Sequence, residues 1–264
     1  MSKTLAGKIA VVTGASRGIG AAIALEFAER GAKGIAITYN SDSTAAEAIV
    51  QKIKNLGSDA FALKVDLLDP EAGEKIVKAV LNGFKTNGID ILVNNAVLLH
   101  QTPFASTTLS DFRIMFDANL AGPIFITQAV LKVIKPQGRI IMISSQASIV
   151  PSPSPFMLYA AAKAALDHLA RSLALEFAEE KKITVNSVMP GPTATASMQW
   201  ADGRLDAMKQ LDAAMLKQLS SKPTAEKRLG TPEEIAHVVA FLAEDKTRWI
   251  NGQAIDVTGG CMAW

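Results

Sequence analysis

Tyr159 and Lys163 are the residues whose types and spacing first suggest chemistry. They stand four positions apart in "YAAAK", residues 159–163. Residues i and i+4 share one face of a helix, so the phenol and the amine are expected side by side. A nearby ammonium favours the phenolate and lowers the pKa of the tyrosine, which makes it a usable acid or base near neutral pH. An inert surface pair has the same spacing, so the surrounding sequence must decide.

Two further polar signals accompany this pair. Ser144 and Ser145 end a predicted strand, residues 138–145, just before the helix that carries Tyr159. A serine hydroxyl there could hydrogen-bond the same substrate oxygen. Asn119 lies inside a predicted long helix, residues 110–135, where asparagine is a poor helix former. It is either a satisfied polar contact between helices or a part of the site.

A glycine-rich turn, "TGASRGIG" at residues 13–20, joins the first predicted strand to the first helix. Its spacing is G-x-x-x-G-x-G, which differs from the G-x-G-x-x-G dinucleotide fingerprint. The physics is related, because glycines allow close backbone approach and a helix N-terminus offers free N–H groups to a pyrophosphate. The second strand ends at Asn40 and Ser41 without the acid that an NAD site usually places there. Asp42 is interpreted as a solvated turn residue, and Arg17 as a partner for a 2′-phosphate. These residues favour NADP(H).

Short apolar runs alternate with helical patterns along the chain. This alternation predicts a single α/β domain over residues 1–264, a Rossmann-type doubly wound seven-stranded parallel sheet with helices on both faces. Ligands bind beyond the carboxyl ends of such strands. A capping box of Thr44 and Glu47 is expected to start the second helix. Strands are predicted at 8–14, 34–39, 60–66, 90–96, 138–145, 183–190 and 252–260, and helices at 19–32, 44–57, from about Pro70, 110–135, 156–180 and 232–243.

The composition excludes several classes of function. The chain has 264 residues, a net charge of +2 with mixed signs, and one cysteine, Cys261, so it offers no nucleic-acid patch and no internal disulfide. We expect no signal peptide and no apolar stretch of roughly 18 residues, and therefore no membrane partner and a cytoplasmic location. The three histidines are His100, His168 and His237. Their spacing is not that of metal ligands, so no metal is expected.

Together, these motifs resemble the short-chain dehydrogenase/reductase family over nearly the whole chain. The matching pieces are TGASRGIG (13–20), Asp66 in "VDLLD", NNA (94–96), Asn119, the serine at the fifth strand end, YAAAK (159–163), "PGPTAT" (190–195) and the terminal "INGQAIDVTGG". The resemblance implies hydride transfer from the nicotinamide C4, with Tyr159 protonating the carbonyl oxygen. Lys163 would hold the nicotinamide ribose and depress the tyrosine pKa, Ser145 would orient the carbonyl, and Asn119 would position a water in a proton relay.

The resemblance also implies a set of cofactor contacts. Asp66 and Leu67 would meet the adenine end, Thr193 would hold the carboxamide through its backbone, and Thr195 would reach the cofactor by its hydroxyl. The full set is Gly14, Ser16, Arg17, Gly18, Ile19, Gly20, Asn40, Ser41, Asp66, Leu67, Asn94, Ala96, Tyr159, Lys163, Pro190, Gly191, Thr193 and Thr195.

Ser145 is preferred over Ser144 because it lies 14 residues before Tyr159. The equivalent serine has that spacing in the family's fungal polyketide-type ketoreductases, which use NADPH. "KKITVNSVMPG", "EDKTRWINGQAIDV" and "YNSDS" also resemble that branch. One position departs from the family: Val97 replaces the usual glycine after NNA, which adds a side chain that could crowd the nicotinamide.

The substrate side is expected from residues 97–100, 146–157 and a lid insertion at about 195–225. Leu98, Phe156, Met157 and Trp200 would form an apolar pocket, with His100 as a further contact. The first hypothesis is an NADPH-dependent carbonyl reductase of an apolar, cyclic or secondary-metabolite-like ketone. The alternatives are a dehydratase, isomerase or cyclase on the same fold, for which Val97 is the hint, and a non-catalytic NADP-binding sensor. The family implies a homotetramer, or a dimer, formed through the helices at 110–135 and 156–180.

Overall fold

A seven-stranded parallel sheet forms the centre of the computed structural model, which describes residues 3–195 and 224–261. The strand order is β3-β2-β1-β4-β5-β6-β7, the doubly wound arrangement predicted from the sequence. The strands are β1 (Ile9–Val12), β2 (Gly34–Tyr39), β3 (Asp59–Lys64), β4 (Ile89–Asn94), β5 (Ile134–Ile143), β6 (Thr184–Pro190) and β7 (Ala254–Val257).

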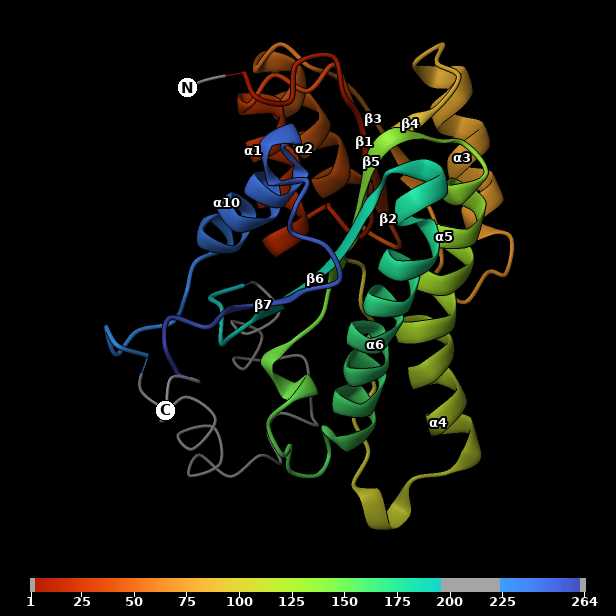
Figure 1. The fold of residues 1–264 in the computed structure, drawn as a ribbon. Coiled ribbons are helices and arrows are strands. Elements are labelled where there is room, and N and C mark those ends of the chain that lie inside the picture. Colours follow the sequence, from red (N-terminus) through yellow and green to blue (C-terminus); the bar gives the residue numbers. More distant parts are fainter. Residues whose placement is uncertain (1–2, 196–223, 262–264) are drawn as a thin grey trace.

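The helices cover both faces of the sheet (Figure 1). They are α1 (Gly18–Glu29), α2 (Ser43–Asn55), α3 (Ala72–Gly83), α4 (Leu109–Phe116), α5 (Gly122–Leu131), α6 (Met157–Lys181) and α10 (Pro232–Ala243). One core cluster lies under α1, α2 and α10, and a second lies under α3, α5 and α6. The central strands β1 and β4 are almost wholly buried, because helices exclude water from both of their faces.

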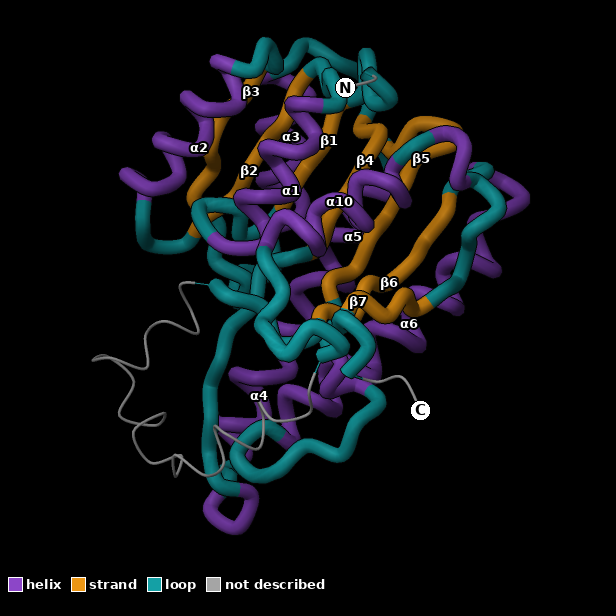
Figure 2. The backbone as a smooth tube through the Cα atoms, turned by 90° about the vertical axis from the view of Figure 1, so that its left-hand side faces the viewer, coloured by secondary structure: helices purple, strands orange, loops and turns teal. Residues whose placement is uncertain are grey.

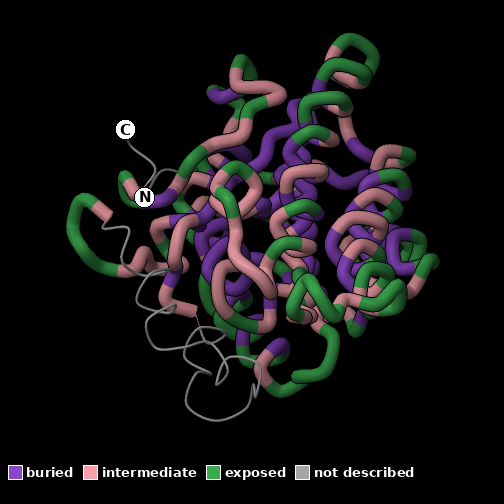
Figure 3. The backbone as a smooth tube through the Cα atoms, turned by 90° about the horizontal axis from the view of Figure 1, so that it is seen from below, coloured by how far each residue is buried: buried purple, intermediate pink, exposed green. Residues whose placement is uncertain are grey.

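The carboxyl ends of the strands gather at one edge, next to α4 and the loops that precede it (Figure 2). Two of these loops are tied together, because the backbone N–H of Phe104 donates to Ser154 Oγ at 2.8 Å. Viewed from below, buried backbone lies toward the middle of the molecule, and exposed and intermediate backbone lies around it (Figure 3). This edge is where a ligand is expected in a doubly wound sheet.

The predicted long helix at 110–135 is in fact three pieces. A π-helical segment, η2 (Asp117–Ala121), separates α4 from α5. The helix ends at Leu131, and β5 begins at Ile134, earlier than predicted, because Val133 and Ile134 favour a strand. The whole run Leu109–Leu131 is long and apolar enough to cross a membrane, contrary to expectation, but half of it is buried against the rest of the fold. A core helix passes the same test.

Candidate active site

The glycine turn connects β1 to α1 and brings the backbone close to the loop after β4. Gly14 and Gly18 have positive φ angles of +63° and +59°, which side chains rarely adopt. A Cβ on Gly14 would lie 2.7 Å from Ala96 Cα, and one on Gly18 would lie 3.5 Å from Thr195 Cγ2. The structure therefore brings together three segments that the sequence assigned to one cofactor site.

The N-terminus of α1 has the character of an anion site. Its N-cap residue, Arg17, is extended and makes no side-chain cap hydrogen bond, and the first turn holds no acidic residue. The first backbone N–H groups and the positive end of the helix dipole therefore point toward the glycine turn. Arg17, Asn40 and Ser41 are exposed.

Asp42 is the N-cap of α2, and its carboxylate accepts from Ala45 N at 2.8 Å. The capping box predicted for Thr44 and Glu47 is wrong, because the helix begins one residue earlier, at Ser43. With this carboxylate used as a cap, the tip of β2 presents no acid of the kind that holds a ribose in NAD sites.

Asn95 also contributes to the structure of this edge, although the sequence predicts no role for it. Its Nδ2 donates to the carbonyls of Thr13 at 2.8 Å and Gly14 at 3.1 Å. The hydroxyl of Thr13 in turn accepts from the backbone N–H groups of Asn95 and Ala96. These bonds lock the glycine turn to the loop after β4. The signal was present in the "NNA" motif, but its second asparagine was not singled out.

The other expected contacts at this edge differ in accessibility. Asn94 is 3% exposed and donates to Thr127 Oγ1 at 2.9 Å, so any contact with a cofactor falls to its backbone. Asp66 is exposed and accepts from Leu68 N at 3.0 Å, while Leu67 is partly buried.

Ser145, Tyr159 and Lys163 converge just beyond the carboxyl end of β5. Ser145 caps a short 3-10 helix, η3 (Gln146–Ser148), by accepting from Ala147 N at 3.1 Å. Ser144 is buried and donates to the carbonyl of Lys163 at 3.2 Å, so it supports α6. Of the two serines, only Ser145 acts on the phenol.

The pKa of Tyr159 is raised by burial and lowered in smaller measure by the Ser145 hydroxyl, although no hydrogen bond of normal length joins the two side chains. The expected lowering by Lys163 is not found. The ammonium lies 5.7 Å from the centroid of the tyrosine ring and donates to the carbonyl of Ile143 at 2.7 Å. Catalytic hydrogen bonds are often longer in ligand-free structures than in the complexes that react.

Lys163 is 3% exposed, and burial lowers its pKa to about 8, against the opposing effect of Asp167. An amine with this pKa is mostly protonated at neutral pH but loses its proton under mildly basic conditions. Its charge is therefore sensitive to small changes in its surroundings.

Asn119 lies in the π-helical segment η2 and is fully buried. Its Nδ2 donates to the carbonyls of Leu98 and Met115, and its Oδ1 accepts from Leu98 N at 3.1 Å. The side chain thus fixes the backbone at Leu98. The role in positioning water that the resemblance implies would fall to the main chain of Asn119, in a segment type that is frequent at functional sites.

Three of the four expected substrate residues lie in the described part of the chain. Leu98 is held by Asn119, and Phe156 and Met157 begin α6, where Met157 is 42% exposed. Val97 is 46% exposed, and it is not among the described non-glycine residues with positive φ, so its backbone needs no glycine. Trp200 and most of the predicted lid lie outside the described residues.

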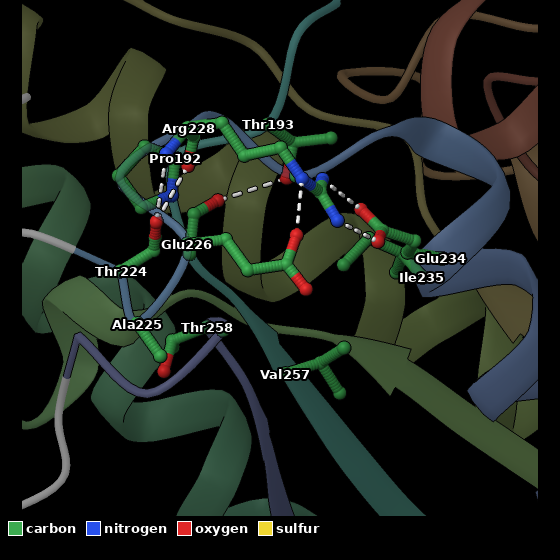
Figure 4. A pocket seen from close by; sticks show the side chains of 13 residues that line it. Pro192, Thr193, Thr224, Ala225, Glu226, Arg228, Glu234, Ile235, Val257 and Thr258 are labelled. Carbon is green, nitrogen blue, oxygen red and sulfur yellow. Dashed lines mark hydrogen bonds and ion pairs between the residues drawn. The ribbon is translucent and has the colours of Figure 1, made fainter.

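The segment Pro190–Thr195 continues from β6 toward a cavity of about 240 Å³ (Figure 4). Thr193 lines this cavity, while Ser145, Tyr159 and Lys163 do not. The Thr193 hydroxyl donates to the carbonyl of Gly191 at 2.9 Å, and its backbone N–H has no partner among the residues that the structure describes. A buried amide of this kind suits a carboxamide oxygen.

The residues present therefore fit a dinucleotide. The α1 N-terminus, which has no side-chain cap, fits the pyrophosphate, and Gly14 leaves room beside Ala96. The amide of Thr193, which has no partner in the described part of the chain, fits the nicotinamide end. No group of His, Cys, Asp and Glu that could hold a metal occurs within residues 3–195 and 224–261.

Comparisons with known proteins agree with this geometry. A family model described as enoyl-(acyl carrier protein) reductase matches residues 14–262. The chain is 41% identical over 263 residues to the short chain dehydrogenase penD of Penicillium thymicola, covering 97% of this chain and 92% of that protein. It is 36% identical over 264 residues to versicolorin reductase 1 of Aspergillus parasiticus, covering 97% of each.

The fold also matches a solved ketoreductase. The angucycline C-6 ketoreductase LanV with bound NADP is 34% identical, with a TM-score of 0.89, and the match covers 100% of this chain and 99% of that one. The matched span includes the glycine turn, the β5 terminus and the first turns of α6. The chain therefore belongs to the short-chain dehydrogenase/reductase family of oxidoreductases.

Proposed function

We propose that the protein is an NADPH-dependent carbonyl reductase that acts on an apolar, cyclic ketone of the secondary-metabolite type. The observation that carries this proposal is the convergence of Ser145, Tyr159 and Lys163 at the carboxyl end of β5, the same edge that holds the glycine turn. The bound nicotinamide would supply a hydride to the carbonyl carbon. NADP in the LanV structure and the exposed Arg17 at the glycine turn support the choice of cofactor.

Tyr159 is the proton donor in this proposal. Burial raises its pKa, so the phenol is protonated at neutral pH and can donate to the carbonyl oxygen. Ser145 holds that oxygen in place by a second hydrogen bond. The Lys163 ammonium lies 5.7 Å from the ring centroid in the free protein, and in the bound complex, where catalytic contacts tighten, its charge would stabilise the phenolate that remains after transfer. Proton resupply follows the relay that the family implies, through Lys163 and the main chain at Asn119.

The proposed substrate class is based on the apolar residues expected beside the site and on the names of two relatives. Leu98, Phe156 and Met157 present apolar side chains beside the site. Two relatives are named as reductases, versicolorin reductase 1 and the angucycline C-6 ketoreductase LanV. Val97 gives no support to a different reaction, because its backbone is unstrained and its side chain is half exposed.

The test is consumption of NADPH with a panel of aryl and cyclic ketones, followed by the absorbance of the reduced nicotinamide. We expect Tyr159→Phe to abolish turnover while NADPH binding, measured by its fluorescence, stays close to that of the unmodified protein. Normal turnover by Tyr159→Phe would contradict the assignment of the acid. Absence of turnover by the unmodified protein with intact NADPH binding would favour the sensor.

A homotetramer, or a dimer, in the cytoplasm completes the proposal. Exposed apolar side chains occur on α4, α5 and α6, at Leu109, Phe112, Phe125 and Leu175, and Leu175 is 85% exposed. Packing against a second copy of the chain would bury such side chains. The molar mass in solution, measured by light scattering, tests the assembly, and a monomer at micromolar concentration would refute it.

A further inference from the structure

Asp167 is a buried carboxylate to which the proposed mechanism gives no role. It is 3% exposed, and neither of its oxygens has a hydrogen-bond partner among the described residues. A buried charge without hydrogen bonds is strongly unfavourable unless an opposite charge lies near it. The question is therefore which cation compensates Asp167.

Lys163 is the buried cation nearest to it along the helix. Asp167 lies one turn after Lys163, in the same buried stripe of α6, and the Cβ atoms of such a pair are about 5–6 Å apart. No ion pair in direct contact joins them, because the Lys163 ammonium donates to the carbonyl of Ile143 at 2.7 Å. The two charges therefore interact through space, in an interior where charges are weakly screened.

The other described side chains around α6 offer no alternative partner for Asp167. Arg171, which is four residues beyond Asp167, is exposed, as is His168. From β6, Ser187 faces the α6 side of the sheet: it is in register with Met142 of that core, is fully buried, and its hydroxyl has no partner among the described residues. Ser187 is uncharged, so it does not balance the carboxylate.

Charged residues on the remaining elements packed against α6 are engaged elsewhere or exposed. On α4, Asp111 pairs with His100, and Arg113 is exposed. On β5, Lys135 pairs with Asp90, and Arg139 donates to the carbonyl of Glu244. Asp117 of η2 is exposed. Tyr159 is the other titratable group beside Lys163. Asp167 is accordingly the one acidic group identified as acting on the Lys163 ammonium.

We propose that Asp167 is a positioning residue for the reduction: its buried negative charge keeps Lys163 protonated and so sets the upper pH limit of catalysis. The inference rests on the proposed function for its effect on activity, but the coupling of the two charges can be measured without turnover. Without Asp167, burial alone would act on the amine, and a larger fraction of Lys163 would be neutral at neutral pH. A neutral amine stabilises the phenolate of Tyr159 less well.

The interaction between Asp167 and Lys163 is tested by unfolding the protein in urea across pH 6 to 11, a range that brackets the Lys163 pKa of about 8. Four proteins are compared: the unmodified protein, Lys163→Met, Asp167→Asn and the double variant. The free energy of unfolding of the unmodified protein is compared with that of Lys163→Met, and that of Asp167→Asn with that of the double variant. The pH dependence of each difference reports the pH at which Lys163 loses its proton in the folded state. We expect Asp167→Asn to lower this pH by about 1 unit or more. An unchanged value would overturn the proposal.

Matched variants separate the charge from the fold. Glu176→Gln removes an exposed acid from the same helix and should leave the Lys163 titration unchanged. Asp167→Glu keeps the negative charge, so Lys163 should lose its proton at nearly the same pH as in the unmodified protein. If Asp167→Asn does not fold, Asp167→Ser provides a second neutral variant for the same comparison. An equal shift with Glu176→Gln would show a general charge effect and would refute the specific role of Asp167.

The kinetic arm uses the pH dependence of kcat/KM for ketone reduction. We expect the basic limb of the profile to move to lower pH by about 1 unit in Asp167→Asn, with recovery in Asp167→Glu. A merely structural role would lower activity equally at all pH values. If the unmodified protein reduces no ketone but the lysine titration still shifts, the proposed function fails while the charge coupling stands.

Discussion

Gly14→Ala should be far more damaging than the same substitution at Gly57, although both glycines have positive φ angles. Gly14 has φ +63° and Gly57 has φ +92°. An alanine in the left-handed region costs about 1–2 kcal/mol, and the stiffer unfolded chain returns about 0.4–1 kcal/mol of this. The strain of the backbone alone therefore predicts a loss of roughly 1 kcal/mol in the free energy of unfolding at either position.

The surroundings distinguish the two glycines. A Cβ on Gly57 meets nothing within 4 Å, whereas a Cβ on Gly14 would lie 2.7 Å from Ala96 Cα and 2.9 Å from Ala96 Cβ. Backbone cannot rotate away as a side chain can, and such overpacking costs about 1–3 kcal/mol more. Gly14→Ala should thus lose about 2–4 kcal/mol in total. Any relief moves the glycine turn away from Ala96, which should weaken NADPH binding on the order of tenfold or more.

The assay is urea unfolding of both variants, together with NADPH affinity measured by fluorescence. Gly57→Ala is the matched control, since it carries the strain without the clash, and it should bind NADPH normally. The reasoning is refuted if Gly14→Ala is no less stable than Gly57→Ala and binds NADPH as well as the unmodified protein does.

Three further predictions follow from the same site. Asn95→Asp removes the two hydrogen bonds donated to Thr13 and Gly14 and places a carboxylate against two carbonyls; we expect a loss of about 2–3 kcal/mol in urea unfolding, and full stability with normal NADPH affinity would contradict this. Arg17→Ala should weaken NADPH binding far more than NADH binding, and titration of each cofactor would expose an error if the two losses were equal. The pKa of Lys163 is about 8 in the folded state against 10.5 for a solvated lysine, so between these values the unfolded state binds more protons and the free energy of unfolding should rise with pH. The rise is at most about 3 kcal/mol, and a Lys163→Met variant with the same pH profile would show that Lys163 is not its source.

The architecture could be predicted from the sequence because the strands are short apolar runs with a clear alternation of helices between them. Strand β2 begins and ends where predicted, at Gly34 and Tyr39. The ends of other elements shifted where local packing outweighed pattern. Asp42 rather than Thr44 caps α2, since a side-chain acceptor one residue before the helix was available.

The candidate site was predicted in part. The segments around Gly14, Ala96 and Thr195 do meet, because parallel strands deliver their carboxyl ends to one edge. The expected effect of Lys163 on Tyr159 did not follow from spacing, because the direction of the ammonium depends on the carbonyl of Ile143, which belongs to another element. The π-helical turn at Asn119 also has no sequence period of its own.

Buried polar residues in an otherwise apolar stripe explain why spacing alone gave an incomplete account. The inner face of α6 is formed mainly by alanine and leucine, and Lys163 and Asp167 interrupt it one turn apart. Alanine allows α6 to lie close to the sheet, which removes the water that would otherwise solvate both charges. A neutral substitution at Asp167 should therefore alter the protonation of Lys163. The small buried side chains of Ala162, Ala170 and Ala174 are therefore part of the chemistry: they let the helix lie close enough to the sheet that the pKa of Lys163 responds to a carboxylate it does not touch.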